Sequence, residues 1–179
     1  MFRAINAQTG LTREEICKSP QLAHEKYGIR GKLHVVDDVT MSIDRLDAYC
    51  RKHKPDILVV DQLDKVKVNG NYEQSHERLR DLYVNAREIA KKYNISVVGL
   101  SQASAEAEGK VSLSFSSMEN SKTGKAAEAD LIIGIGRYAQ EGKDEEDLTR
   151  IMHISKNKLT GWHGNIVCVL NNQLSRYEA

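Results

Sequence analysis

The sequence contains no apolar run that approaches the ~20 residues a membrane-spanning helix needs. Its N-terminal stretch, MFRAINAQTG, has no apolar signal core. The three cysteines lie far apart and form no C-x-x-C pair, which argues against a disulfide framework. The six histidines show no metal-ligand spacing. These absences predict a cytoplasmic protein with no membrane partner and with three free thiols, Cys17, Cys50 and Cys168.

The sequence also has no large excess of charge of one sign, because 26 basic and 25 acidic residues leave a formal net charge of +1. The net charge therefore gives no indication that nucleic acid or acidic lipid is a partner. A local stripe of lysines can still bind phosphates within a neutral chain. A hydrophobic fraction of 40% and a length of 179 residues fit one ordinary globular domain, residues 1–179.

Helical patterns occur in four places along the chain. Thr12 and Glu15 have the spacing of a capping box, which predicts a short helix after Thr12. A second helix is expected in PQLAHEKYG, with Gly28 as its stop. In residues 42–55, Ile43, Leu46 and Cys50 share one helical face. A long helix is expected over residues 73–93, with a buried stripe formed by Leu79, Leu82, Ala86, Ile89, Ala90 and Tyr93.

Strand patterns alternate with these helices. KLHVVDD (32–38), DILVVD (56–61), ISVVGLSQ (95–102) and ADLIIGIGR (129–137) are apolar runs, and a continuous apolar run is typical of a strand covered on both faces. Strands that alternate with helices predict an α/β fold with a mostly parallel sheet. The last three runs, 150–158, 165–171 and 174–179, predict an antiparallel meander, with Gly161 and Gly164 at the first turn.

Polar residues stand where the predicted strands end. These are Asp37 with Asp38, Asp61, Ser101 with Gln102, Arg137 and Lys156. Ligands of parallel α/β sheets bind outside the carboxyl ends of the strands. The sequence therefore predicts a polar site at one rim of an apolar sheet, with Asp61 within it.

A long segment over about 103–125 does not fit the alternation of helices and strands. It is rich in Ser, Gly and charge, and loops of this length inside compact domains are uncommon and are functional or disordered. As a ligand-binding loop it offers Lys110, Lys122 and Lys125 for phosphates and Phe115 for base stacking. A solvated surface loop is the alternative interpretation.

Four motifs in this order resemble the C-terminal RecA-like ATPase domain of DnaB-type replicative helicases. ILVVDQLDKV resembles a Walker B segment, and VVGLSQAS resembles the sensor strand. ENSKTGKAAEADLIIGIGR resembles the segment where a DNA-binding loop leads into a short helix and strand. ISKNKLTGWHG resembles the K-N-R-x-G-x-x-G hairpin. The resemblance covers nearly the whole chain and implies a RecA-like, P-loop NTPase-type sheet flanked by helices, with an antiparallel C-terminal hairpin.

Two family features are missing from these 179 residues. There is no G-x-x-x-x-G-K-[ST] loop, which cradles the nucleotide phosphates in such enzymes, and the catalytic Glu that follows it is missing too. From the resemblance, Met1 is expected to fall just after that position. The resemblance thus implies the downstream part of an ATP-dependent replicative DNA helicase motor, and the chain alone is expected to lack ATPase activity.

The resemblance assigns roles to residues that match the motifs. Asp61 would hold the Mg²⁺ of bound ATP, through water. Gln102 would sense the γ-phosphate. The alternative for Asp61 is a carboxylate that caps the turn after its strand. The alternative for Gln102 is an ordinary hydrogen bond at the end of its strand.

Lys156 and Lys158 match the family's Lys-x-Arg pair, which reaches the nucleotide held by the neighbouring subunit of a hexameric ring. They would serve as catalytic and nucleotide-binding residues. Lys158 stands where the family has the arginine finger, and a lysine supplies charge without the planar fork of a guanidinium. Two solvated hairpin lysines are the alternative. Single-stranded DNA and further copies of the chain are the partners that the resemblance implies.

Three other interpretations remain open from the sequence. One is a non-catalytic RecA-like module for oligomerisation or DNA binding, and another is a RecA-type recombinase relative. The third is a receiver-like phosphoacceptor domain. Such a domain has two acids, an acceptor Asp, a Ser or Thr and a Lys at its strand ends, which correspond here to Asp37, Asp38, Asp61, Ser101 and Lys156. Only 22 residues lie between Asp38 and Asp61, which fits one crossover but barely the two that a receiver needs.

Overall fold

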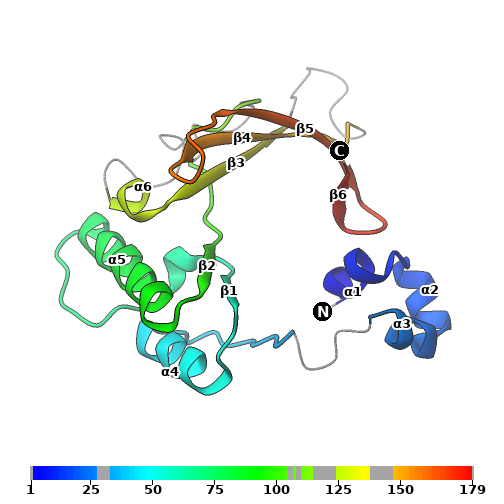
Figure 1. Cartoon of the computed structure of the whole chain (residues 1–179), viewed down its shortest axis with the longest axis horizontal. Helices are drawn as coiled ribbons and strands as arrows, with labels where there is room; N and C mark the ends of the chain where they lie inside the picture. Colours follow the sequence, from blue (N-terminus) through cyan, green and yellow to red (C-terminus); the bar gives the residue numbers. More distant parts are fainter. Residues whose placement is uncertain are drawn as a thin grey trace.

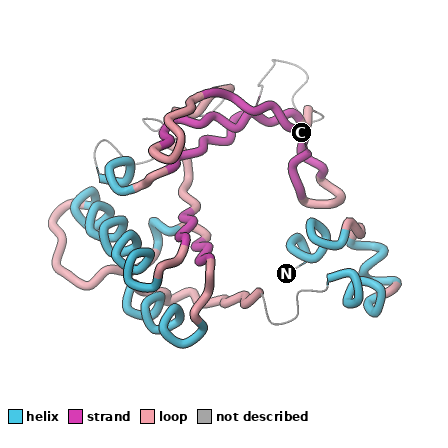
Figure 2. The backbone as a smooth tube through the Cα atoms, in the orientation of Figure 1, coloured by secondary structure: helices cyan, strands magenta, loops and turns pink. Residues whose placement is uncertain are grey.

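The computed structural model describes residues 2–27, 33–104, 107, 110–114, 124–137 and 147–178. The elements form three groups (Figure 1): helices α1–α3, a unit of α4, β1, β2 and α5, and a sheet of β3–β6. Helices α1–α3 lie on the opposite side of the molecule from α4 and α5 (Figure 2). No helix in the described ranges is long and apolar enough to cross a membrane.

The first group consists of α1 (Phe2–Thr9), α2 (Arg13–Lys18) and α3 (Pro20–Tyr27). The predicted capping box is confirmed: Glu15 N–H donates to Thr12 Oγ1 at 3.3 Å, and Thr12 N–H donates to Glu15 Oε2 at 2.8 Å. Helix α1 lies outside the helices that the sequence patterns predict. Leu11, Ile16 and Ala23 form a small core of their own.

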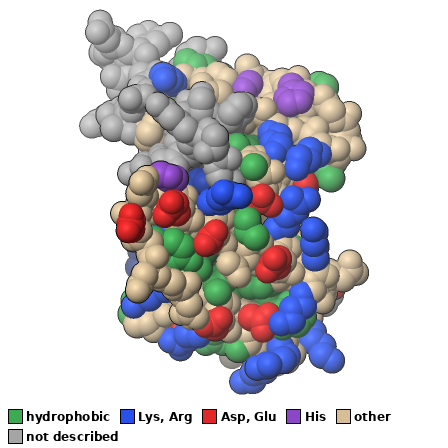
Figure 3. Space-filling view, turned by 90° about the vertical axis from the view of Figure 1, so that its left-hand side faces the viewer, with side chains coloured by type: hydrophobic (Ala, Val, Ile, Leu, Met, Phe, Trp, Pro, Cys, Tyr) green, Lys and Arg blue, Asp and Glu red, His purple; other side chains and the backbone are tan. Residues whose placement is uncertain are grey.

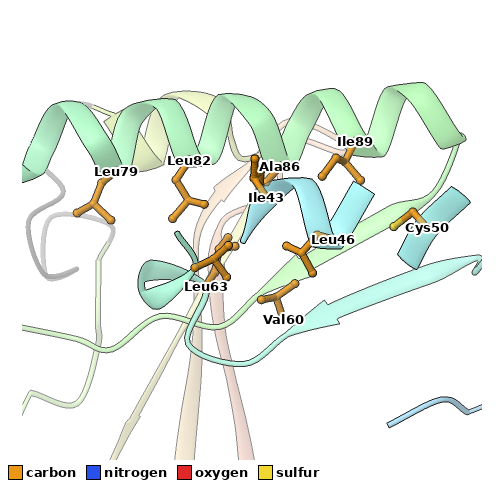
Figure 4. Packing of buried hydrophobic residues seen from close by; sticks show 10 residues of the cluster. Ile43, Leu46, Cys50, Val60, Leu63, Leu79, Leu82, Ala86 and Ile89 are labelled. Atoms are coloured by element: carbon orange, nitrogen blue, oxygen red, sulfur yellow. The ribbon is translucent and has the colours of Figure 1, made fainter. Parts of the chain in front are cut away.

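The second group packs α4 (Ile43–His53) and α5 (Ser75–Tyr93) against one face of the parallel strands β1 (Ile57–Val60) and β2 (Ser96–Gly99). The helices predicted over 42–55 and 73–93 are confirmed. The buried residues of this core are Ile43, Leu46, Cys50, Val60, Leu63, Val66, Leu79, Leu82, Ala86 and Ile89 (Figure 4). A 3-10 turn, η1 (Leu63–Lys65), follows β1 and places Leu63 in this core.

The β1–β2 pair is covered on one face only within the described residues. Leu58, Val60 and Val97 face the helices, whereas Ile57, Val59 and Val98 alternate with them and are exposed. Ile57 and Val59 each keep 60% of their surface open to solvent. The prediction that these strands are buried on both faces is therefore wrong for this chain by itself. A period of two determines which residues face the helices, but it cannot say whether a second layer is present.

The strand predicted over 32–38 is also wrong, because residues 33–38 have no strand geometry. Leu33, Val35 and Val36 are exposed, and among the described strands β1 pairs only with β2. The nearest parallel contact that the described residues make is an isolated bridge between Ser42 and Lys67, beyond the end of this segment. Without a ladder to a neighbour, its β-branched side chains gain nothing from an extended conformation.

The third group is a four-stranded antiparallel sheet in the order β3-β4-β5-β6. Its strands are β3 (Leu131–Arg137), β4 (Thr149–Asn157), β5 (Gly164–Asn171) and β6 (Arg176–Glu178). The predicted C-terminal meander is confirmed. Strand β3 forms as predicted, but it pairs antiparallel with β4 rather than with a parallel neighbour. Gly161 has φ +74°, which explains glycine at the β4–β5 turn.

A five-residue helix, α6 (Gly124–Glu128), lies between the second and third groups and leads into β3. It packs beside α5, where Arg87 forms an ion pair with Glu128 at 3.1 Å.

All three cysteines are free, as predicted.

Leu82 has no exposed surface and lies at the centre of the α4–α5 core. We expect Leu82→Ala to lower the free energy of unfolding by roughly 2–5 kcal/mol, through lost burial and a cavity. Leu159→Ala is the control: this side chain is 73% exposed, and its truncation should change stability by less than about 0.5 kcal/mol. Denaturant unfolding followed by circular dichroism measures both, and equal effects would contradict the described core.

Candidate functional site

The carboxyl ends of β1 and β2 lie next to each other. The two strands pair in parallel with Val60 opposite Gly99. Beyond the strands, Leu100 N–H donates to Val60 O and Leu63 N–H donates to Leu100 O, each at 2.9 Å. Asp61 therefore leaves one strand beside the point where Ser101 and Gln102 leave the other. This is the rim that the sequence predicted for a polar site.

Asp61 and Gln102 are exposed at this rim. The Asp61 carboxylate makes no hydrogen bond or ion pair with any described residue, and the same holds for the Gln102 side-chain amide. Asp61 thus does not cap the turn that follows β1. Both groups remain open to a ligand, and a carboxylate without a protein partner is the kind of ligand that Mg²⁺ takes through water.

Next to this rim lies a polar cluster around Asp64, in which Lys125 is buried and the Asp64 side chain is 23% exposed. Tyr83 O–H donates to Asp64 Oδ1 at 3.0 Å, and Ser101 O–H donates to Oδ2 at 2.6 Å. Lys125 Nζ lies 2.6 Å from the same Oδ2 and 3.3 Å from Ser101 Oγ. Burial, followed by the negative charge of Asp64, raises the pKa of Tyr83 far above its usual value. The phenol therefore stays protonated and keeps its donor role.

Lys125 is 1% exposed, although the sequence placed it among the DNA-binding lysines. Its ammonium faces Asp64 and Ser101 and lies 5.8 Å from the centre of the Tyr83 ring. In this position the amine is closed to a phosphate of DNA. No local sequence pattern pairs Asp64 with a lysine 61 positions away.

The predicted finger residues Lys156 and Lys158 both lie against the end of α6. Lys156 Nζ donates to Ala126 O, and at 3.4 Å to Ala127 O. Lys158 Nζ lies 3.5 Å from Ala127 O and 3.4 Å from the Asp130 carboxylate. Burial, followed by the positive charge of Lys158, lowers the pKa of Lys156. Within one chain these lysines stabilise the carbonyl end of a helix, and their action on a neighbour's nucleotide remains a prediction.

Part of the predicted DNA-binding loop crosses the β3 strand. Lys110 is exposed, and the backbone of residues 110–113 passes directly over Gly134 and Gly136. Lys122 and Phe115 fall outside the described residues. Arg137 ends β3 in an exposed position opposite Arg150.

Of the two acidic residues that precede α4, Asp37 and Asp38, the second has a structural role. Asp38 Oδ1 accepts from the Thr40 N–H and hydroxyl, each at 2.9 Å, and Oδ2 pairs with Arg45 at 2.6 Å. The Thr40 N–H and hydroxyl are the main cause of a lowered pKa for Asp38, and Arg45 adds to it. Across the described ranges no three His, Cys, Asp or Glu residues come together as a metal site. The receiver-like interpretation finds no acidic cluster to support it among these residues.

Comparison with known proteins identifies the family. Residues 4–179 match the family model described as the DnaB-like helicase C-terminal domain. The chain belongs to this family, as its ordered motifs predicted, and that membership gives it a role in a replicative helicase motor. No curated protein sequence matches it.

Solved structures agree with the predicted RecA-like fold. One solved ATPase domain superposes with a TM-score of 0.81 at 16% identity, covering 98% of this chain and 68% of that one. A DnaB-like replicative helicase, studied for its interactions with primase, gives a TM-score of 0.80 at 16% identity. That match covers 98% of this chain and 47% of the helicase, so this chain spans about half of that protein.

The crossing at β3 leads to a test of loop placement. A Cβ added to Gly136 would lie 2.2 Å from the carbonyl oxygen of Val111, which is backbone and has to move. We expect Gly136→Ala to lower the free energy of unfolding by about 1–3 kcal/mol and to speed tryptic cleavage after Lys110. In the control, Gly164→Ala, the added Cβ meets only the exposed Trp162 ring, which can rotate. If cleavage after Lys110 is unchanged in Gly136→Ala, the crossing is wrong.

Proposed function

We propose that this chain is the part of an ATP-driven replicative DNA helicase motor that carries the Walker B carboxylate, the sensor amide and the DNA-binding loop. The observation that carries the proposal is the pairing of β1 with β2, which sets Asp61, unpartnered among the described residues, beside Gln102. Membership of the helicase family is the reason for assigning nucleotide chemistry to Asp61 and Gln102.

The residues present fit part of a magnesium nucleotide site. Asp61 would hold Mg²⁺ through water, and Gln102 would donate to a phosphoryl oxygen and accept from the attacking water. When bound, Mg²⁺ neutralises charge that builds up on the phosphates. The cradle for those phosphates is not among the 179 residues. ATP turnover therefore needs residues that these do not include.

The uncovered face of β1 and β2 supports this interpretation. Ile57, Val59, Val98 and Leu100 are exposed apolar residues on the two strands that carry the site or just after them. Parallel strands are normally covered on both faces. About a third of the matched ATPase domain has no counterpart in this chain, since 68% of it is covered. A further layer of the motor would cover these side chains.

Single-stranded DNA is the proposed substrate, held by the 103–125 loop in a ring of several copies, which we take to be a hexamer. Lys110 and Lys122 are the phosphate contacts that we retain, because Lys125 is buried. On the face formed around α4 and α5, acidic and basic side chains are interspersed (Figure 3). Acidic side chains occupy the middle of that face, which makes the loop the better place for a nucleic acid.

A non-catalytic RecA-like module is the second candidate. The contacts that Lys156 and Lys158 make with carbonyl oxygens of α6 in the same chain favour it. Such a module would keep the DNA loop and the contacts between copies without turning over nucleotide.

We expect the 179-residue chain alone to release no phosphate from ATP in the presence of Mg²⁺. The reason is that one carboxylate and one amide cannot position a triphosphate. A phosphate-release assay on the purified chain, with Asp61→Asn as the matched variant, checks this. Turnover that disappears in Asp61→Asn would show that the chain holds a complete site.

We expect the chain to bind an oligo(dT) strand with an affinity that falls as salt rises, because phosphate contacts release counterions. Lys110→Ala should reduce the slope of log affinity against log salt by about 0.7. Fluorescence anisotropy of a labelled strand measures it. Lys52→Ala, an exposed lysine on α4, is the control and should leave the slope unchanged. Equal slopes for Lys110→Ala and the unmodified chain would remove Lys110 from the interface.

A further inference from the structure

The helix α6 makes polar contacts with three parts of the molecule. At its start, Lys125 contacts Asp64 and Ser101, which stand beside the ends of β1 and β2. At its end, the carbonyl oxygens of Ala126 and Ala127 accept from Lys156 and Lys158. On its side, Glu128 pairs with Arg87 of α5. This short helix therefore connects the candidate nucleotide site to the hairpin lysines.

Among the charged side chains of these contacts, Lys125 is the buried one, whereas its partner Asp64 is 23% and Lys158 is 44% exposed. The Lys125 side chain is 1% exposed, whereas those of Arg87 and Glu128 are 37% and 25% exposed. Exposed ion pairs contribute little to stability. A buried ammonium, by contrast, has to keep its oxygen partners, because an unpaired charge in that position is costly. The position of α6 is thus fixed mainly by where Asp64 and Ser101 lie.

Those two residues are close in sequence to the ligand groups of the site. Ser101 directly precedes Gln102, and Asp64 lies in the η1 turn that follows Asp61. The long loop that is expected to bind DNA ends where α6 begins. A shift of the strand ends or of the loop has to move Lys125 or break its contacts.

We propose that Lys125 is a positioning residue: through its ion pair with Asp64 and its contact with Ser101, it sets α6 and thereby the placement of Lys156 and Lys158. Because of this connection, events at the strand ends and in the DNA loop reach the lysines of the hairpin. The functional meaning of that connection rests on the proposed helicase function, whereas the positioning itself does not.

The main test is a paired substitution, Asp64→Asn with Lys125→Met, which removes both charges and keeps the side chains close in size. Replacing a buried ion pair by neutral groups is often close to neutral for stability, so the global unfolding midpoint should stay near that of the unmodified chain. The readout is hydrogen exchange of the Lys158 amide, which donates to Asp130 O at 2.8 Å, just beyond α6. We expect its exchange to speed up by roughly tenfold through local opening.

The matched control makes the same two kinds of substitution in another ion pair. Lys92 Nζ lies 2.7 Å from Asp47 Oδ1, between α5 and α4 and away from α6. Asp47→Asn with Lys92→Met should leave exchange at Lys158 unchanged. If the Asp64 and Lys125 double variant does not fold, Tyr83→Phe takes its place: it removes one donor to Asp64 and keeps the ring, and a smaller rise is expected. Unchanged exchange at Lys158 in the folded variant would overturn the positioning role.

A second measurement uses the only tryptophan, Trp162, which stands 51% exposed in the same hairpin. Adding oligo(dT) to the unmodified chain should change Trp162 fluorescence. The Asp64 and Lys125 double variant should still bind the labelled strand but lose that change. A change that persists in the double variant would contradict the proposed connection through Lys125. If the unmodified chain binds no strand at all, the DNA part of the proposed function fails, and hydrogen exchange still decides the positioning role.

Discussion

A lysine ammonium buried within a protein has to be surrounded by oxygen atoms, and this requirement organises the centre of the molecule. The oxygens that surround Lys125 come from Asp64, in the turn after β1, and from Ser101, which follows β2. Tyr83 of the long helix completes the cluster through its hydroxyl. One charge thus joins α6 to the segments that follow β1 and β2 and, through Tyr83, to α5. The β3–β6 sheet continues directly from α6, so its placement follows from the same contact.

The parts of the fold that rest on local periodicity could be predicted from the sequence. The capping box at Thr12, the buried stripe of α5 and the C-terminal meander are each determined by neighbours along the chain. The order of the rim residues Asp61, Ser101 and Gln102 could be predicted too, because parallel pairing brings equivalent strand ends together.

What could not be predicted depends on partners that are distant or missing. The apolar run 32–38 has strand composition, but no described strand pairs with it. Ile57 and Val59 have the composition of core residues, yet no described layer covers them. Lys125 looks like a loop lysine until Asp64 is found beside it. In each case the residue type is informative, and the contact that gives it meaning lies outside its sequence neighbourhood.

The open face of β1 and β2 has a practical consequence for handling the protein. Among the described residues these strands form a two-stranded sheet with apolar side chains open on one face and no further strand at either edge, which is a template for adding another chain. The 179-residue polypeptide in isolation therefore carries an adhesive surface, and its association will rise with concentration. Folding together with the layer that covers this face turns the same side chains from a source of aggregation into an interior.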